Sequence, residues 1–392
     1  MDQIILLVLI GFLIGVYGAY VVATIRVKNP LPSGRLKGRT YPRVSILKPL
    51  KDMDDEIQQN IESFFQIHYP DYEIIFAVDQ MTDPVVKILE KIKLQYPRIP
   101  CRIISTGHCS RYNPKVHKLM AMEKQADGDL FWITDSNIRA GSGILIQLVN
   151  EYLLRGSKLI FSPIHATGGR TIGSIIENAY INLFLSGNVI LAWKCFKQHL
   201  IVGKSILFEK KTLAHLGGFS YFRDYLAEDF MMGEIYRACH FPIATNYVWV
   251  TTINSHTRIG GFWKRMNRWA KLRYRLKPHF YILEILLNPV PLLLGSWWVF
   301  PYPAVLTATT LILMGKILLE LINHRFVNRE RGVRLATTLL LPLLIILKDL
   351  ILFFSYFTPF FSDTVEWRGG KITIGPHTLI TSTQEVLQLE GA

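Results

Sequence analysis

The sequence predicts a domain of the α/β class, with a mixed, largely parallel sheet and membrane segments near both ends of the chain. Short apolar runs alternate with helical patterns between residues 44 and 133, an order that builds parallel strands with right-handed crossovers. Long uncharged runs lie near the N-terminus and beyond residue 284. One buried strand, Leu130–Ile133, ends abruptly in polar residues, and ligands of open α/β sheets bind at such strand ends.

Composition favours a membrane protein over a nucleic-acid-binding protein. Hydrophobic residues make up 50% of the 392 residues, and the formal net charge is +14. Lys and Arg cluster beside the apolar runs, as expected at an anionic membrane face. The four cysteines include no C-x-x-C pair, which argues against a zinc site or a disulfide framework and fits a reducing compartment. We expect no nucleic-acid partner, and the oligomeric state stays open.

The N-terminal run Ile4–Ile25 contains 22 uncharged residues, enough to span a bilayer. A cleaved signal peptide is the competing interpretation, but no basic segment precedes the run and its apolar core is too long. Eight basic residues and no acidic one follow between Arg26 and Lys51, which by the positive-inside rule puts the next domain in the cytosol. The predicted divisions are an anchor at 1–25, a basic linker at 26–43 and a globular domain at 44–261.

Apolar periodicity and turn residues predict the elements of this domain. The domain lacks the G-x-G-x-x-G and G-x-x-x-x-G-K-[ST] motifs, which argues against dinucleotide and P-loop sites. Asp83 and Asn113 each precede a proline that suits the first position of a helix. Helices are expected at Asp55–Gln66, from Pro84 through Leu94 and from Pro114 onwards. Strands are expected at Val44–Leu47, Tyr72–Val78, Cys101–Ser105, Leu130–Ile133, Leu159–Ser162 and Val202–Phe208.

Three C-terminal stretches are expected at or in a membrane. Phe262–Lys277 is basic and amphipathic and suits a membrane interface, with a solvated basic helix as the alternative. Ile285–Gly315 has 31 uncharged residues with two proline pairs, and we interpret it as a membrane hairpin that continues to Ile322. Leu335–Ser362 is apolar except for Lys348-Asp349; it spans the membrane, re-enters it or lies in the interface. The predicted divisions are an interfacial helix at 262–280, membrane segments at 281–362 and a tail at 363–392.

Residue types that carry chemistry stand at the ends of the predicted elements. Each has a plain structural explanation, such as a turn, a helix cap or an interfacial anchor. Asp135-Ser136-Asn137, at a strand end, has oxygen donors that can also hold a hard divalent cation against a diphosphate. A membrane-anchored α/β domain with all these residues in order favours a catalytic site. The set is Asp79, Asp83, Lys115, Asp135, Glu228, Asp229, Arg265, Arg268 and Trp269.

From about Val44 to about Leu276, the chain resembles the ceramide glucosyltransferase family, the inverting family 21 glycosyltransferases of GT-A fold. One matching segment has the (Q/R)-x-x-R-W pattern, which processive synthases share. Around Gly233-Glu234-Ile235 the chain also resembles a related bacterial branch that glycosylates hopanoids. The matching segments are Leu47–Leu50, Asn60–Tyr69 with the following Pro70, Asn113–Lys115, Trp132–Arg139, Ala227–Phe230 and Arg265–Trp269.

The resemblance implies transfer of a sugar, first of all glucose, from a UDP-sugar donor to the hydroxyl of a membrane lipid such as ceramide. Direct displacement would give a β-glycolipid. Asp79, Asp83 and Lys115 would bind the UDP-sugar. Asp135 would also bind it and would hold Mg²⁺ or Mn²⁺, which neutralises the departing UDP.

On the acceptor side, the resemblance makes Asp229 the general base that takes the proton from the attacking hydroxyl. Neighbouring Glu228 is the rival base, and a helix N-terminal acid is the structural alternative for Asp229. Arg265 and Arg268 would brace the pyrophosphate, since Arg forks suit phosphate oxygens. Trp269 would stack near the sugar or the acceptor.

The chain departs from the family pattern at two positions. The family's first Asp falls at Gln80 in an ungapped comparison, so Asp79 takes its role through a local shift. The third residue of the metal motif, Asn137, is neutral. In the tail, Glu366-Trp367-Arg368-Gly369 resembles a segment that family members keep near the active site.

Two other function classes stay open at this stage. A processive polysaccharide synthase shares R-x-x-R-W but normally needs more membrane segments to form a polymer channel. A non-catalytic membrane scaffold is opposed by the joint presence of Asp135, Asp229 and the basic motif. The sequence does not choose among ceramide, hopanoid, diacylglycerol and sterol acceptors, or between UDP-glucose and UDP-N-acetylglucosamine. It predicts an integral protein of a bacterial inner membrane or a Golgi- or ER-type membrane.

Overall fold

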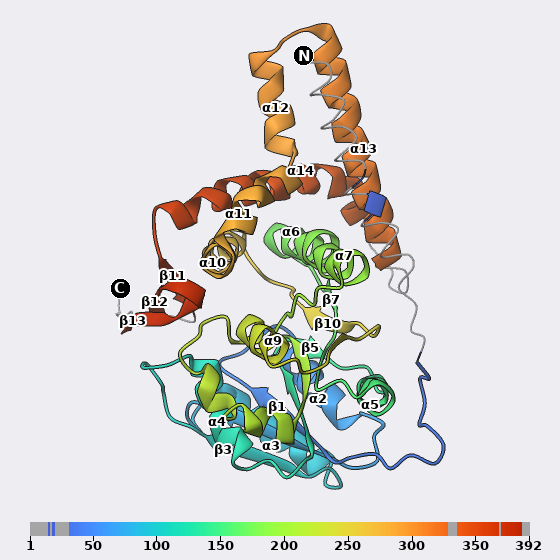
Figure 1. Cartoon of the computed structure of the whole chain (residues 1–392), viewed down its shortest axis with the longest axis vertical. Helices are drawn as coiled ribbons and strands as arrows, with labels where there is room; N and C mark the ends of the chain where they lie inside the picture. The colour runs from blue at the N-terminus through green and yellow to red at the C-terminus, as the bar shows by residue number, and fades with distance from the viewer. Residues whose placement is uncertain (1–14, 16–17, 20–30, 328–334, 368–369, 386–392) are drawn as a thin grey trace. The chain divides into compact units, whose positions relative to one another are not determined.

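The computed structural model describes residues 15, 18–19, 31–327, 335–367 and 370–385 (Figure 1). The chain divides into two compact units. The sheet unit comprises residues 28–167, 198–254 and 366–392, and the helical unit comprises 1–27, 168–197 and 255–365. Apart from three positions, the predicted N-terminal anchor at 1–25 lies outside the described residues.

The described residues of the sheet unit form a seven-stranded sheet of order β3-β2-β1-β4-β8-β6-β9. Neighbouring strands run parallel, except that β8 is antiparallel to both β4 and β6. The predicted mixed, largely parallel sheet is therefore confirmed. The strands are β1 (Val44–Pro49), β2 (Tyr72–Val78), β3 (Cys101–Ser105), β4 (Leu130–Thr134), β6 (Leu159–Phe161), β8 (Ser205–Glu209) and β9 (Ile243–Thr245).

The centre of this sheet is buried on both faces, which explains why its strands read as almost continuous apolar runs. Ile46, Phe76 and Trp132 on three neighbouring strands are fully buried. The Trp132 indole N–H donates to Ser205 Oγ at 3.0 Å, so the largest core side chain keeps a hydrogen-bond partner. This rigid centre fixes the strand ends at which the polar residues emerge.

Helices and two smaller sheets complete the sheet unit, except that the first two residues of β11 belong to the helical unit. Both predicted caps are confirmed, since Asp83 accepts a hydrogen bond from Val85 N and Asn113 accepts one from Lys115 N. The smaller sheets have the orders β5-β10-β7 and β11-β12-β13. Their strands are β5 (Ile138–Arg139), β7 (Ile164–Thr167), β10 (Val250–Ile253), β11 (Thr364–Trp367), β12 (Gly370–Ile374) and β13 (Ile380–Glu385). The helices are α2 (Ile57–Phe65), α3 (Pro84–Gln95), α4 (Pro114–Glu123), α5 (Ile144–Arg155), α8 (Lys210–His215), α9 (Glu228–Ala238) and the short η2 (Phe219–Phe222) and η5 (Pro376–Thr378).

The helical unit contains the predicted amphipathic helix, α10, and the predicted apolar hairpin. Figure 1 shows α12 and α13 as a hairpin with α14 running across its base. The turn between α12 and α13 contains Pro301, and Pro303 begins α13. Trp297 Nε1 donates across the hairpin to Thr309 Oγ1 at 2.6 Å. The elements are α6 (Ile172–Ala179), the π-helical η1 (Tyr180–Leu185), α7 (Ser186–Phe196), α10 (Ile259–Leu276), α11 (Pro278–Glu284), η3 (Ile285–Leu287), α12 (Val290–Val299), α13 (Pro303–Val327), α14 (Leu335–Phe357) and η4 (Thr358–Phe360).

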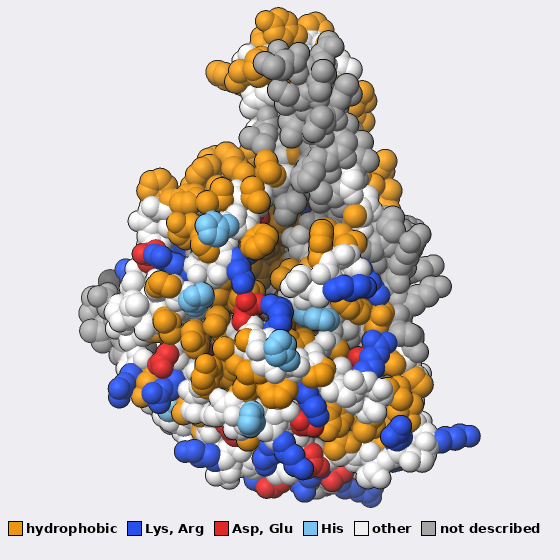
Figure 2. Space-filling view, in the orientation of Figure 1, with side chains coloured by type: hydrophobic (Ala, Val, Ile, Leu, Met, Phe, Trp, Pro, Cys, Tyr) orange, Lys and Arg blue, Asp and Glu red, His pale blue; other side chains and the backbone are white. Residues whose placement is uncertain are grey.

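Three helices in the described part of the chain are long and apolar enough to cross a membrane: Ile172–Phe196, Pro303–His324 and Leu339–Phe360. The first was not predicted from the sequence, because polar residues such as Glu177 and Asn182 interrupt its apolar pattern. At the tip of the α12–α13 hairpin, Figure 2 shows hydrophobic side chains on the surface, and Trp298 there is 92% exposed. Such exposed apolar side chains suit a lipid environment.

Four buried charges, which we call the charge quartet, join α13 to α14. Lys316 Nζ lies 2.7 Å from Glu320 and also contacts the Asp349 carboxylate. Lys348 Nζ lies 2.8 Å from Glu320 and 3.3 Å from Asp349. Because the quartet has no net charge and every member has a partner of opposite sign, these groups can be buried in apolar helices.

Candidate active site

Asp135 stands directly after β4 and is surrounded by lysines. Lys115 Nζ lies 3.1 Å from its Oδ1 atom, and Lys204 Nζ lies 3.4 Å from its Oδ2 atom. Lys204 also donates to Asn137 Oδ1 at 2.9 Å. Lys48 Nζ donates a hydrogen bond to the Asp135 backbone oxygen at 2.6 Å. The strand end therefore presents the predicted carboxylate, Asp135, within a mixed cluster of lysines and acids.

Lys48 and Lys204 were not predicted as site residues. Lys48 lies in β1, inside the Leu47–Leu50 segment, and is fully buried. Burial lowers the pKa of Lys48 to about 7, although nearby Asp135 opposes the shift. Lys204 follows Gly203 just before β8, and this position at a strand end was the available signal for it.

Lys115 connects the strand end to the start of α9. Its Nζ atom lies 3.0 Å from Glu228 Oε1 and donates to the Gly203 carbonyl at 3.2 Å. Burial alone would lower the pKa of Lys115, but the carboxylates of Asp135 and Glu228 raise it above its ordinary value. The ammonium group therefore stays charged at neutral pH.

The two adjacent acids of α9 have different surroundings. Glu228 is buried and forms an ion pair with Lys115. It also accepts a hydrogen bond from Asn113 Nδ2 at 2.9 Å. Asp229 remains partly exposed and accepts hydrogen bonds from the backbone N–H groups of Gly203 at 2.6 Å and Phe230 at 2.8 Å. Removal of water by the surrounding protein, together with the charge of Glu228, raises the pKa of Asp229 to about 6. That value suits a general base near neutral pH.

A residue with a side chain would clash at position 203, because a Cβ atom on Gly203 would lie 2.6 Å from Asp229 Oδ2. Its N–H group bonds Asp229 and its carbonyl bonds Lys115. One residue without a side chain thus holds both a carboxylate and an ammonium group. Gly203 was not predicted as a site residue either.

The C-terminal tail supports the segment that leads into α9. Leu226 N donates to the Thr378 carbonyl at 2.9 Å, and Ala227 N donates to Thr378 Oγ1 at 3.2 Å. Thr378 is fully buried and has a φ of 62°, a backbone conformation that is costly for a β-branched residue. The tail was predicted near the active site through Glu366–Gly369; the structure brings Thr378 against the residue before Glu228, and residues 368–369 lie outside the described residues.

Asp79 and Asp83 lie at the end of β2 and the start of α3. Lys118 Nζ is 2.6 Å from Asp79 Oδ1; burial would raise the pKa of Asp79, but Lys118 holds it below its ordinary value. Asp83 caps α3 and also accepts a hydrogen bond from Asp52 N at 3.2 Å. Lys115 and Lys118 are three residues apart on α4 and are therefore neighbours on its surface. Lys115 contacts Asp135 and Lys118 contacts Asp79. Donor binding by Asp79 and Asp83 stays a prediction.

Arg265, Arg268 and Trp269 lie on α10 in the helical unit, whereas the acids and lysines above lie in the sheet unit. Arg265 forms an ion pair with Glu177 of α6, whose side chain is fully buried. The Trp269 ring lies 5.7 Å from the Tyr180 ring, measured between centroids. The catalytic roles expected for the three α10 residues stay predictions.

The family model for glycosyl transferase family 21 matches residues 4–380. The chain belongs to glycosyl transferase family 21. Ceramide glucosyltransferase 3 of Caenorhabditis elegans is 24% identical over 374 residues, which cover 94% of this chain and 81% of the relative. Ceramide glucosyltransferase 1 of the same organism is 26% identical, over 62% of this chain and 53% of the relative.

Among solved structures, a mannosyltransferase from Pyrobaculum calidifontis, in complex with GDP-Man and Mn²⁺, has a TM-score of 0.51 to this chain. The two are 15% identical, over 91% of this chain and 99% of the mannosyltransferase. This likeness supports the predicted GT-A-type fold. As a family 21 member with this fold, the chain is a glycosyltransferase.

A divalent cation in this family 21 site would find hard oxygen donors in Asp135 and Asn137. Within the described ranges, no three His, Cys, Asp or Glu side chains gather into a metal-binding group. Mg²⁺ commonly uses one or two carboxylates and completes its shell with substrate phosphates and water. The donor set therefore fits a cation that arrives with a diphosphate, provided that Lys115 and Lys204 turn towards the phosphates.

Proposed function

We propose that this glycosyltransferase transfers glucose from UDP-glucose to a hydroxyl of a membrane lipid such as ceramide, with inversion, giving a β-glycolipid. The names of the two nematode relatives support this acceptor and this sugar. Three helices suited to a membrane support a lipid acceptor. The observation that carries the choice of Asp229 as base is the contrast between Glu228, which is buried and held by Lys115 at 3.0 Å, and Asp229, which is partly exposed.

In the proposed reaction, the acceptor hydroxyl oxygen attacks the anomeric carbon and forms the new C–O bond. The bond between that carbon and the UDP oxygen breaks, and UDP leaves with the electron pair. Asp229 takes the proton of the attacking hydroxyl, so the oxygen of the new glycosidic bond carries no charge at the end of the step. Because one displacement occurs at one carbon, an α-linked donor gives a β-linked product.

The lysines around Asp135 suit the leaving UDP. Lys115 and Lys204 would contact the phosphate oxygens. A bound Mg²⁺ or Mn²⁺, held by Asp135 and Asn137, would neutralise charge on the diphosphate. On α10, we propose that Arg265 and Arg268 brace the pyrophosphate and that Trp269 stacks near the sugar or the acceptor.

Purified full-length protein with UDP-glucose and ceramide tests the function directly. We expect mass spectrometry to detect hexosylceramide, and NMR of the product to show a β linkage. Asp229→Asn is the matched control and should form little product. UDP-N-acetylglucosamine, diacylglycerol and a hopanoid serve as competing substrates, and a clear preference for any of them would replace the corresponding part of the proposal.

We also propose that the glycosyltransferase domain at 44–261 faces the cytosol, apart from the unpredicted apolar helix Ile172–Phe196 within it, and that membrane segments lie at 1–25 and 281–362. Cys239 in the sheet unit is exposed and offers a natural probe in a Cys195→Ser background. An impermeant maleimide should label Cys239 after permeabilisation and not in intact cells. Labelling in intact cells would reverse the orientation.

A further inference from the structure

One apolar helix of the helical unit contains a buried carboxylate. Helix α6 continues directly into η1 and α7, and together they form the candidate span Ile172–Phe196. Glu177 lies in α6, and its side chain is fully buried. A charged side chain is costly in an apolar helix, so acids in such helices have partners and commonly mark functional positions. The partner of Glu177 therefore indicates what this acid does.

That partner is Arg265, the first arginine of the R-x-x-R-W segment on α10. Glu177 Oε1 forms an ion pair with Arg265 Nη1, whereas Glu177 Oε2 has no hydrogen-bond partner among the described residues. No second cation contacts Glu177 within the part of the chain that the structure describes. Removal of Arg265 would leave a buried carboxylate without compensation, which is far more costly than the loss of a surface ion pair. The ion pair therefore connects α6 firmly to α10.

The start of α6 is fixed on the chain that leads into α10, and Figure 1 shows the two helices side by side. Thr171 Oγ1 donates to the Thr257 carbonyl at 2.5 Å, and Ser174 Oγ donates to the Ser255 carbonyl at 2.8 Å. A Cβ atom on Gly173 would lie 2.5 Å from the Thr257 carbonyl oxygen, so the two backbones are in close contact there. These contacts set where along α10 the side chains of α6 lie.

A ring contact continues the face that Glu177 occupies. Glu177 and Tyr180 are three residues apart, and Arg265 and Trp269 are four residues apart on α10, so each pair shares a helix face. The Tyr180 and Trp269 ring centroids lie 5.7 Å apart, and buried Tyr180 also packs against Phe262 at 6.2 Å. One face of α6 and η1 therefore contacts both the first arginine and the tryptophan of the R-x-x-R-W segment.

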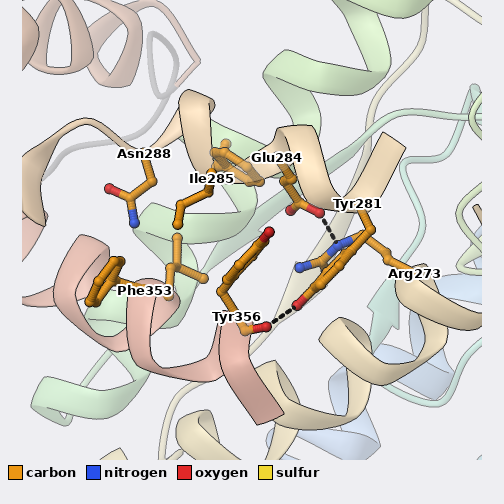
Figure 3. A pocket seen from close by; sticks show the side chains of 9 residues that line it. Arg273, Tyr281, Glu284, Ile285, Asn288, Phe353 and Tyr356 are labelled. Atoms are coloured by element: carbon orange, nitrogen blue, oxygen red, sulfur yellow. Dashed lines mark hydrogen bonds and ion pairs between the residues drawn. The ribbon is translucent and has the colours of Figure 1, made fainter. Parts of the chain in front are cut away.

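The far end of α10 has its own anchor, which Figure 3 shows. Arg273 Nε donates to Glu284 of α11 at 2.9 Å. Tyr281 of α11 donates its hydroxyl to the Tyr356 carbonyl of α14 at 2.9 Å, and the two rings stack with centroids 5.0 Å apart. Because other groups hold both ends of α10, loss of the Glu177 carboxylate should disturb the Arg265 side chain more than the helix itself.

We propose that Glu177 is a positioning residue of the glycosyltransferase, which fixes the Arg265 guanidinium in the orientation that binds the diphosphate of the donor. The Arg265 side chain is 34% exposed, so a ligand can reach it. A guanidinium is planar and rigid, so a carboxylate bound at one of its N–H groups also sets the direction of the others. Fixing this long side chain in advance removes an entropy loss that phosphate binding would otherwise carry. The inference rests on the proposed role of Arg265 at the pyrophosphate.

Calorimetric titration with UDP in the presence of Mn²⁺ measures this role without relying on turnover. In the full-length protein in detergent, we expect Glu177→Gln to weaken UDP binding about fivefold, because the guanidinium loses its anchor. The KM for UDP-glucose should rise, whereas the KM for ceramide should stay the same. Glu177→Met, with an apolar side chain of similar size, should have the same effects and provides a second variant if the amide prevents folding.

Glu151→Gln is the matched control, because the Glu151 side chain on α5 is also fully buried and lies 3.5 Å from an arginine, Arg155. This control should leave the UDP affinity unchanged. A double variant then shows whether Glu177 acts through Arg265. Arg265→Ala alone should weaken UDP binding about tenfold and lower the melting temperature, because it leaves Glu177 unpaired. Adding Glu177→Gln should restore part of the melting temperature without a further loss of UDP affinity.

The outcomes separate this inference from the proposed function. Weaker UDP binding by Arg265→Ala, with normal binding by a folded Glu177 variant or a further loss in the double variant, overturns the positioning role alone. Normal UDP binding by Arg265→Ala overturns the proposed role of Arg265 and this inference with it. If the variants bind UDP as expected but the wild-type protein forms no hexosylceramide, the proposed function is wrong and the positioning role of Glu177 is retained.

Discussion

Lys115 Nζ lies 3.0 Å from Glu228 Oε1, and this ion pair separates the roles of two adjacent acids. Glu228 is buried and committed to Lys115 and Asn113. Asp229, one position on, is partly exposed and accepts hydrogen bonds from the backbone N–H groups of Gly203 and Phe230. Glu228, the rival candidate for the base, thus has a structural role.

Asp229→Asn is expected to cut turnover by roughly 10²- to 10⁴-fold while UDP binding stays nearly intact, because it removes the general base. Steady-state rates and calorimetric titration with UDP measure the two effects. Glu228→Gln is the matched control and should lower the melting temperature, since it leaves Lys115 with one fewer carboxylate. Normal turnover by Asp229→Asn, with loss in Glu228→Gln, would exchange the assignments.

Turnover should fall as the pH drops below about 6, because Asp229 must be ionised to accept a proton and its pKa is about 6. Folding raises this pKa from its ordinary value of 3.8. Between these values the folded state binds more protons than the unfolded state, so this group's contribution to stability falls as the pH rises. Melting curves from pH 4 to pH 7 should show that slope reduced in Asp229→Asn, and a pH–rate profile without a fall near 6 would refute the role of Asp229.

Asp135→Ala should reduce turnover by more than about 10²-fold, because it removes the carboxylate proposed to hold the cation and to orient two lysines. A chelator should abolish the wild-type activity, and added Mn²⁺ should restore it. Asn137→Asp should preserve activity and bind Mn²⁺ more tightly, which titration in the presence of UDP measures apart from catalysis. Full activity in excess chelator would remove the metal from the proposal.

Thr378→Val should destabilise the protein by about 1–2 kcal/mol, because it keeps the side-chain shape and deprives Ala227 N of its acceptor. Turnover should also fall, since Glu228 and Asp229 follow directly, whereas UDP affinity should change little. Thr378→Ser keeps the hydroxyl and should behave like the wild type. Equal behaviour of the Val and Ser variants would show that this hydrogen bond does not position the acids.

Lys348→Met should destabilise the helical unit by about 3–5 kcal/mol, because it leaves the charge quartet with an uncompensated buried carboxylate. A second substitution, Glu320→Gln, removes one negative charge and should recover part of the loss. Thermal unfolding of the single and double variants in detergent measures the coupling. Additive losses would mean that Lys348 and Glu320 act independently.

Local sequence determined much of the sheet unit. The strands Tyr72–Val78 and Cys101–Ser105 match their predicted bounds, because apolar runs between turn residues specify buried strands through short-range patterns. The caps at Asp83 and Asn113 match for the same reason, as each side chain bonds a backbone N–H within three residues. Asp135 and Asp229 could be singled out because strand ends and helix starts are visible in the sequence.

Only the tertiary structure decided which groups surround those acids. Lys204 reaches Asp135 from 69 positions away, and Thr378 reaches Ala227 from 151 positions away. It also decided that residues 168–197 join the helical unit. Hydrogen-bond patterns within one helix or strand repeat along the sequence, whereas contacts between distant segments depend on how the whole chain packs.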